Sequence, residues 1–431
     1  MDLAYMAALP MEEFAQRRAK VFELMQEDSL FLVFSDIERR RNDGCDYPFR
    51  QDSYFWYLTG FNEPNSALLL RKQHGEQQAI IFVRPSDKLL EIWNGRRLGV
   101  DNAPQTLLVD TAYAIDEFVP QFKNLAQKQT ALYYAPKQQP WGDALLEQSA
   151  VEFLSVFNWK PMLGEMRLFK SENEIALMQQ AGQISAFGHI KAMQQTRPNR
   201  LEYEVESDIL HEFNRFGARY PSYNSIIAGG ENACILHYSE NDMPLRDGDL
   251  VLIDAGCEFA MYAGDITRTF PVNGQFTEAQ KAIYEIVLQA QKRAIELLVP
   301  GGSIAKANEE VIRIKTEGLV RLGILKGDVD ELIEQKAYRE FYMHGLGHWL
   351  GLDVHDVGEY GENRDRTLEP GMVLTVEPGL YLSKEADIPE QYKGIGIRIE
   401  DNLLITDYGN KNLTSAAPKE IADIEKLMAD A

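Results

Sequence analysis

The chain has 431 residues, 45% of them hydrophobic and 26% charged, and a formal net charge of −22. A single hydrophobic core stops growing at about 250 to 300 residues, so this length predicts two domains in a globular protein. The acidic balance argues against a nucleic-acid partner, which would need a basic surface, and the lack of an apolar run of about 18 residues argues against a membrane span.

The amino terminus and the cysteines predict where the protein is located. No basic residue precedes Glu12 and Glu13, which interrupt the chain before an apolar core of signal-peptide length can form. Cys45, Cys234 and Cys257 are an odd number of cysteines without a CxxC spacing. Such a set is typical of reduced thiols. We therefore expect a cytoplasmic protein.

Residues 1–170 have the pattern of a smaller mixed α/β domain. Residues 14–25 have the spacing of a short amphipathic helix. Apolar runs bounded by turn residues predict strands at 29–34, 67–70 and 79–83. Helix and strand patterns alternate from 110 to 154, and we expect 162–170 to be a linker.

The segment from Glu91 to Gly99 contains Trp93 and a pair of arginines bracketed by glycines. Its spacing alone does not separate a surface turn with solvated arginines from a functional segment. Both interpretations therefore stay open on these residues.

A second domain is expected over residues 171–431. Ser171 and Glu174 form a capping box, which marks the start of a long helix. Further helices are expected over 201–216, after Thr277 and after Ser303. This domain holds 25 Lys+Arg against 43 Asp+Glu, compared with 19 against 23 in the first domain. We interpret most of these carboxylates as a solvated acidic surface.

Some carboxylates lie where a solvated surface is not expected, at the ends of apolar strands. Asp254 ends the strand that begins at Asp249, and Asp265 lies on an expected returning strand over 262–270. A hairpin would bring the two aspartates together, and a cation between them would relieve their repulsion. An aspartate that caps each turn is the alternative for this pair.

Glu377 and Glu400 repeat this pattern downstream. Glu377 ends an apolar strand that Pro and Gly terminate. In the segment 394–401 the isoleucines alternate with Arg398 and Glu400, which therefore share the face opposite the core. We interpret that face as the wall of a cavity, with an exposed edge strand as the alternative.

Three of the seven histidines, His344, His348 and His355, fall within twelve residues of a glycine-rich stretch. The first two are four residues apart, but a glycine stands where the glutamate of an H-E-x-x-H zinc helix would be. Four carboxylates and a histidine suit divalent Mn, Co or Fe better than a structural zinc. Their combined charge favours two ions over one. The sequence thus predicts a site for two divalent metal ions.

The ordered set Asp254, Asp265, His348, Glu377 and Glu400 resembles the ligand set of the pita-bread metallopeptidases, and among them the aminopeptidase P (Xaa-Pro aminopeptidase) family. The local sequences that carry the resemblance are DAGCEFAMYAGDITRTFPV, MHGLGHWLGLDVHD, TVEPGLY and GIRIEDN, with YPFRQDSYFWYLTGFNEP and EIWNGRRLG in the amino-terminal part. The resemblance covers nearly the whole chain. It implies an α/β (α+β) fold in which the smaller mixed α/β domain precedes a pita-bread catalytic domain.

The resemblance implies a role for each metal ligand. Asp254 would bind one of two Mn²⁺ ions alone, and Asp265 and Glu400 would bridge both ions. His348 and Glu377 would complete the other ion. A hydroxide between the ions would attack the carbonyl of the bond that precedes proline, and Glu377 would carry a proton to the departing nitrogen.

Further residues match positions that surround the substrate in this family. His237 and His355 would be catalytic, because they would stabilise the oxyanion and hold the peptide. His344 and Arg364 would line the pocket beyond the scissile bond.

Three more matches concern the support of the site. Tyr381 and Arg398 match residues that orient the metal ligands. Trp93 matches a tryptophan that helps to close the site of a neighbouring subunit. This last match implies a homotetramer.

The implied activity is that of an exopeptidase that releases the amino-terminal residue from peptides with proline in the second position. A prolidase, which cleaves only dipeptides, shares the ligands and the fold and is the first alternative. A non-catalytic binding module is the second, although no ligand is missing. The large amino-terminal domain disfavours a methionine aminopeptidase. We assign no role to His189 or His211.

Overall fold

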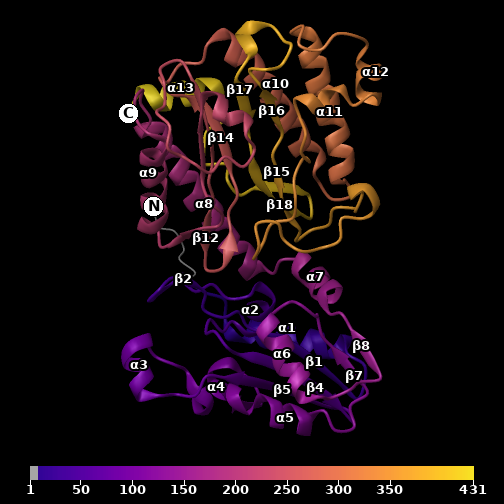
Figure 1. Ribbon diagram of the computed structural model, residues 1–431. Coiled ribbons are helices and arrows are strands. Elements are labelled where there is room, and N and C mark those ends of the chain that lie inside the picture. Colours follow the sequence, from indigo (N-terminus) through magenta and orange to yellow (C-terminus); the bar gives the residue numbers. More distant parts are fainter. Residues whose placement is uncertain (1–7) are drawn as a thin grey trace. The chain divides into compact units, whose positions relative to one another are not determined.

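The computed structural model describes residues 8–431, which form two compact units, residues 8–163 and residues 164–431 (Figure 1). Each unit has its own sheets and its own buried apolar side chains. Within the described residues, no helix has both the length and the hydrophobicity that a membrane span requires.

The amino-terminal unit is built on a six-stranded mixed sheet in the order β6-β5-β4-β1-β7-β8. The predicted strands at 29–34, 67–70 and 79–83 are confirmed, and the last two are longer than expected. All six residues of the central strand β1 are buried. The strands are β1 (Ser29–Phe34), β4 (Ala67–Gln73), β5 (Glu76–Val83), β6 (Thr111–Ala114), β7 (Ala131–Tyr133) and β8 (Ser155–Phe157), with a separate hairpin of β2 (Arg40–Asn42) and β3 (Cys45–Asp46).

Helices alternate with these strands, as the sequence predicts for 110–154. The expected helix at 14–25 is confirmed and begins three residues earlier, at Met11. Trp93 lies in a short helix, and the two arginines follow it in the loop between that helix and the next. The helices are α1 (Met11–Leu24), α2 (Ser53–Thr59), α3 (Lys88–Asn94), α4 (Gly99–Leu107), α5 (Phe118–Leu125) and α6 (Pro140–Ser149).

The prediction of a linker at 162–170 is wrong, because α7 (Lys160–Leu168) occupies most of this segment. Its proline is the second residue of the helix, where a backbone N–H has no partner in the helix and its absence costs little. Leu163 and Leu168 are fully buried, so packing stabilises the helix despite the proline and a glycine.

The second unit contains the long helices that the sequence predicts. Ser171 and Glu174 form the expected capping box at the start of α8. Thr277 caps α10 and Ser303 caps α11 through their side chains, also as expected. Figure 1 shows α8 to α11 around the strands of this unit. The helices are α8 (Glu172–Gln195), α9 (Glu202–Arg215), α10 (Glu278–Leu297), α11 (Ile304–Arg321), α12 (Val329–Glu334) and α13 (Ile421–Ala429).

The strands of the second unit form several small antiparallel sheets. Their orders are β10-β11-β14, β13-β12-β9, β15-β18-β19 and β16-β17. The strands are β9 (Tyr220–Pro221), β10 (Ile226–Gly229), β11 (Leu250–Asp254), β12 (Cys257–Phe259), β13 (Tyr262–Ala263), β14 (Thr267–Pro271), β15 (Val373–Val376), β16 (Gly379–Leu382), β17 (Ile395–Arg398), β18 (Asp401–Thr406) and β19 (Gly409–Asn412).

The strand that ends at Asp254 pairs with the predicted returning strand, but the chain between these two strands differs from the prediction. β11 and β14 are antiparallel, with Asp254 opposite Thr267. The expected single strand over 262–270 is instead divided, because β12 and β13 form a small ribbon of their own and Asp265 lies between β13 and β14. The alternation rule therefore does not apply across Asp265, which lies in the irregular segment between β13 and β14.

A close backbone approach holds the two aspartate segments together. A Cβ atom on Gly256 would lie 1.9 Å from the carbonyl oxygen of Gly264. Real Cβ atoms do not come so near to a backbone oxygen, so only glycine fits at this position. Gly256 follows Asp254 by two residues, and Gly264 directly precedes Asp265.

We expect Gly256→Ala to push these segments apart. It should lower the free energy of unfolding by about 1–3 kcal/mol, the usual effect of an added methyl group in a packed interior, and should weaken metal binding. Urea unfolding and titration with Mn²⁺ measure both effects. Gly164→Ala is the control, because the nearest atom to its added Cβ would be 3.7 Å away. Equal stability of the two variants would contradict the constraint.

Candidate metal centre

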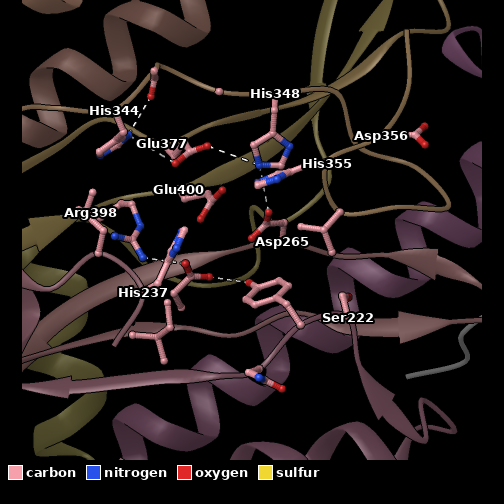
Figure 2. Close-up of a pocket in the computed structure, with 18 of the residues that line it drawn as sticks. Ser222, His237, Asp265, His344, His348, His355, Asp356, Glu377, Arg398 and Glu400 are labelled. Atoms are coloured by element: carbon pink, nitrogen blue, oxygen red, sulfur yellow. Dashed lines mark hydrogen bonds and ion pairs between the residues drawn. The ribbon is translucent and has the colours of Figure 1, made fainter. Parts of the chain in front are cut away.

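All five predicted metal ligands line one pocket of about 860 Å³ in the second unit. Figure 2 shows the carboxylates of Asp265, Glu377 and Glu400 and the ring of His348 directed toward a common space. The fifth residue, Asp254, lines the same pocket. The structure thus brings together side chains that are distributed over nearly 150 residues of sequence.

Each of the four carboxylates lies at or next to a strand end. Asp254 is the last residue of β11, and Glu377 follows β15 directly. Asp265 lies two residues before β14, and Glu400 lies between β17 and β18. Side chains at strand ends point away from the hydrogen-bonded interior of a sheet, so short neighbouring sheets can contribute to one centre.

Asp265, His348 and Glu400 form the tightest group. One donor atom from each residue lies within 4.8 Å of those from the other two. His348 Nε2 is 3.4 Å from Asp265 Oδ2 and 3.5 Å from Glu377 Oε1. Donor atoms that each bind one cation at about 2.0–2.2 Å are separated by such distances.

The tautomer of His348 suits a metal ligand. Its Nδ1 is 3.0 Å from the carbonyl oxygen of Trp349, which can only accept a hydrogen bond. A proton on Nδ1 therefore leaves the lone pair of Nε2 directed toward the carboxylates. This arrangement of a backbone acceptor behind the ring is typical of metal-binding histidines.

Burial and mutual repulsion raise the pKa values of the carboxylates in the metal-free chain. Burial raises the pKa of Glu377 to about 7, against the opposing effect of His348. Burial raises the pKa of Asp254, and burial together with the neighbouring carboxylates raises that of Glu400 well above its ordinary value. Burial disfavours the charged form of His348, but Asp265 outweighs it and raises its pKa to about 9. In the absence of metal, protons take the place of cations here.

The donor set fits divalent metal ions. It combines four carboxylates with one imidazole, which are the ligands that Mn, Co and Fe accept, and contains no thiolate. Arg398 contacts this group directly through Asp254, and a protonated His348 contacts Asp265 and Glu377. Two positive charges do not neutralise four carboxylates, so the remaining negative charge is available to cations.

Arg398 contacts the predicted ligand Asp254, and Tyr381 contacts Arg398. Arg398 Nη2 donates to Asp254 Oδ2 at 2.6 Å, and its Nη1 donates to the Tyr381 hydroxyl at 3.0 Å. Its Nε donates at 3.0 Å to the hydroxyl of Thr267, which itself donates to Glu400 Oε2 at 2.7 Å. Arg398 therefore orients one carboxylate directly and a second one through Thr267.

The four predicted substrate residues also line the pocket; they are His237, His344, His355 and Arg364. The His355 ring packs edge-on against His348, with 4.3 Å between the ring centroids. His344 Nε2 is 2.8 Å from the Tyr381 hydroxyl. Burial lowers the pKa of His344 to about 3 and also lowers that of His355. Both imidazoles are therefore neutral in the metal-free chain at neutral pH.

Arg364 lies at the edge of the pocket in a constrained position. Its Nη1 donates to the carbonyl oxygen of Gly347 at 2.6 Å, and its guanidinium lies 4.5 Å from the centre of the Tyr360 ring. These contacts hold a positive charge next to the glycine-rich turn that carries His348. The charge can therefore meet a substrate carboxylate without a large loss of side-chain entropy.

Trp93 and His189 do not line this pocket. Trp93 belongs to the amino-terminal unit, where 80% of its side-chain surface is exposed on α3. His189, to which we assign no role, is fully buried in α8 and its Nε2 is 3.0 Å from the carbonyl oxygen of Ala255. It is therefore a core histidine.

Sequence reasoning missed four polar side chains that hold the ligands, of which Thr267 is described above. Tyr223 donates its hydroxyl to Asp254 Oδ1 at 2.6 Å. Thr375 accepts from the backbone N–H of His348 at 3.0 Å and donates to Glu377 Oε1 at 3.2 Å. Asn402 accepts from the backbone N–H of Asp265 at 3.1 Å. Thr375 and Asn402 lie two residues from a ligand on a strand, which puts them on the same face, and this alternation could have identified them.

Family models match both units. Residues 176–407 match metallopeptidase family M24, and residues 14–133 match the amino-terminal domain of aminopeptidase P. The chain is 72% identical to the Xaa-Pro aminopeptidase of Haemophilus influenzae, over 99% of this chain and 100% of that protein. It is 52% identical to the Xaa-Pro aminopeptidase of Escherichia coli, over 99% of each chain.

Solved structures of Escherichia coli aminopeptidase P have the same fold. A zinc-substituted form in complex with product superimposes with a TM-score of 0.97 at 51% identity, over 98% of this chain and 99% of that one. A complex with the inhibitor Pro-Leu gives a TM-score of 0.96 at 52% identity. These comparisons give no support to the prolidase alternative. The chain belongs to metallopeptidase family M24, with a pita-bread catalytic domain, and within that family to the metal-dependent Xaa-Pro aminopeptidases.

Proposed function

We propose that this Xaa-Pro aminopeptidase works with two divalent ions, Mn²⁺ in the native enzyme. The observation that carries the proposal is the convergence of four carboxylates, two buried and two part-buried, and one imidazole in a single pocket. Asp254 would hold one ion, Asp265 and Glu400 both, and His348 and Glu377 the other. Bound there, the ions lower the pKa of a water molecule and polarise the peptide carbonyl.

Glu377 is the proton carrier in this proposal. Its Oε1 is held by Thr375 and lies near His348, while Oε2 lies 3.7 Å from His344 Nδ1. A carboxylate whose pKa lies near neutral pH can both take a proton from water and give it to the departing nitrogen of proline.

His237 and His355 are the catalytic histidines in this proposal. Both line the pocket beside the carboxylate group, and each ring can donate a hydrogen bond to the oxygen that becomes negative during attack. The bond to proline has no N–H, so donors to the carbonyl oxygen take over the recognition that other proteases obtain from that N–H.

His344 and Arg364 would contact the part of the peptide beyond the scissile bond. His344 is fixed through Tyr381 and the carbonyl oxygen of Gly345, and Arg364 through Gly347. A fixed neutral ring that can pack against proline and a fixed cation suit a proline ring followed by a backbone carbonyl or a terminal carboxylate. Peptides with proline in the second position are therefore the proposed substrates.

Trp93 supports a homotetramer in which one subunit closes the site of another. α3 has no buried residue, and it exposes Leu89, Leu90, Ile92 and Trp93, whose exposed fractions run from 40% to 80%. A short helix that presents four large apolar side chains is typical of an interface rather than of a solvated surface.

We place the enzyme in the cytoplasm. Its three cysteines are free thiols, and Cys45 is exposed. An exposed free thiol is compatible with a reducing compartment.

Glu377→Ala should abolish hydrolysis and leave the fold intact, because it removes a metal ligand and the proton carrier together. We expect a loss of at least about 10³-fold in kcat for Ala-Pro-Ala with added Mn²⁺. Glu385→Ala, which alters an exposed glutamate on the same stretch of chain, is the control. Activity of the Glu377 variant within a few-fold of the unaltered enzyme would refute the mechanism.

A panel of three peptides tests the substrate class. Ala-Pro-Ala should be cleaved after its first residue, and Ala-Ala-Ala should remain intact, since it lacks proline. Cleavage of Ala-Pro alone would instead identify a dipeptidase, and cleavage of none would identify a binding module. Chromatography of the products distinguishes these outcomes.

Metal should stabilise the chain more as the pH rises. The folded metal-free chain raises the pKa of Glu377 from 4.5 to about 7. Its protonated form therefore stabilises the fold at low pH, and this contribution is lost as the pH rises through about 7. Bound cations replace the protons, so the increase in Tm on adding Mn²⁺ to EDTA-treated enzyme should be small at pH 5 and large at pH 8. A pH-independent increase would contradict this linkage.

Trp93→Ala should lower activity without destabilising the isolated subunit, because the side chain is 80% exposed. We expect a loss of about tenfold in kcat/KM if the indole helps to close a neighbouring site. Tyr408→Ala is the control, since this aromatic side chain is also fully exposed. Sedimentation velocity gives the oligomeric state, and a fully active monomer would exclude the proposed role.

A further inference from the structure

The turn that carries His237 is largely exposed and does not by itself fix the position of the His237 ring. It follows the short 3-10 helix Gly230–Cys234, and Ile235, His237 and Ser239 are exposed. Among the described residues, the His237 ring makes no hydrogen bond. A side chain on such a turn would sample many positions unless a neighbour anchors the backbone.

Tyr238, the next residue, is the buried exception in this turn, with 4% of its surface exposed. Its ring packs in a cluster with Ile226, Leu252 and Tyr381. Its hydroxyl donates to Glu202 Oε2 at 2.7 Å. Burial and the bond to Glu202 raise the pKa of Tyr238, so the hydroxyl keeps its proton and remains a donor.

Glu202 accepts from four donors on this part of the chain. Oε2 also accepts from the backbone N–H of Met243 at 3.0 Å. Oε1 accepts from the backbone N–H of Gly229 at 2.8 Å and from Asn232 Nδ2 at 3.1 Å. The side chain is fully buried in the first turn of α9, where the helix dipole favours a carboxylate. Glu202 thus ties both ends of the segment 229–243 to one point.

We propose that Glu202, acting through Tyr238, is a positioning residue that fixes His237 against the reacting carbonyl group. This inference rests on the catalytic role of His237 proposed above. Glu202 does not line the pocket, whereas His237 and Tyr238 both do, so Glu202 acts on the reaction through the turn that carries them. Figure 2 shows His237 on the other side of the pocket from His348, where a small shift of the turn changes its distance to a bound peptide.

The test is a double-mutant cycle with Tyr238→Phe and His237→Ala in the full-length enzyme loaded with Mn²⁺. Tyr238→Phe keeps the packed ring and removes only the anchoring hydroxyl. We expect it to lower kcat for Ala-Pro-Ala about tenfold and to change KM less than about twofold, because misplacement of a catalytic group affects the reacting geometry. In the His237→Ala background the same substitution should change kcat less than about twofold.

Tyr284→Phe is the matched control. Tyr284 is also buried and donates to a protein oxygen, the carbonyl of Lys419, at 2.8 Å, but it does not line the pocket. This variant should keep kcat within about twofold of the unaltered enzyme. Glu202→Gln is a second probe of the anchor, because its amide nitrogen would face donors. It should lower kcat at least as much as Tyr238→Phe.

The possible outcomes distinguish the positioning role of Glu202 and Tyr238 from the catalytic role of His237. A full tenfold loss from Tyr238→Phe in the His237→Ala background would overturn the positioning role and leave the role of His237 standing. Unchanged activity of Tyr238→Phe would overturn it as well. Unchanged activity of His237→Ala would instead refute the catalytic role of His237, and the positioning role with it.

Discussion

The repulsion among four carboxylates, two buried and two part-buried, is the constraint on which the catalytic unit depends. Asp254, Asp265, Glu377 and Glu400 share one pocket, where the guanidinium of Arg398 and the ring of His348 contact them directly. Charges in a low-dielectric site interact strongly, so this arrangement is stable only when protons or cations offset the charge. In the metal-free chain the pKa values of three of these carboxylates are raised, because bound protons reduce the negative charge of the group. The repulsion among the carboxylates makes the metal-free site costly, and the same repulsion favours the binding of metal cations.

The surrounding polar side chains determine where each carboxylate oxygen points. Tyr223 and Arg398 each occupy one oxygen of Asp254, and Thr267 occupies one oxygen of Glu400. These bonds leave defined lone pairs directed into the pocket. An outer layer that fixes the ligand geometry before metal binds reduces the entropy lost on binding. Glu202 extends the same principle to the substrate side, since it immobilises the turn next to a proposed catalytic histidine.

The histidine-rich stretch separates into distinct environments in the structure. His348 lies among carboxylates that raise its pKa, whereas burial lowers the pKa of His344 and His355. The carboxylates around His348 favour a cation there, whereas the rings of His344 and His355 are neutral, so three neighbouring histidines suit different tasks. Their environments, and not their spacing, make this division, because the stretch forms turns and no helix.

The sequence by itself determined the long capped helices and the fold class, and it predicted the candidate ligands. Carboxylates that end apolar strands are costly unless paired, so Asp254 and Glu377 are conspicuous in the sequence alone. Only the tertiary structure decided that Asp265 lies in an irregular segment between two strands, that residues 160–168 form a helix, and that Tyr238 donates to Glu202. These features arise from contacts between segments far apart in the chain, and neither periodicity nor local propensity encodes which distant partner a side chain meets.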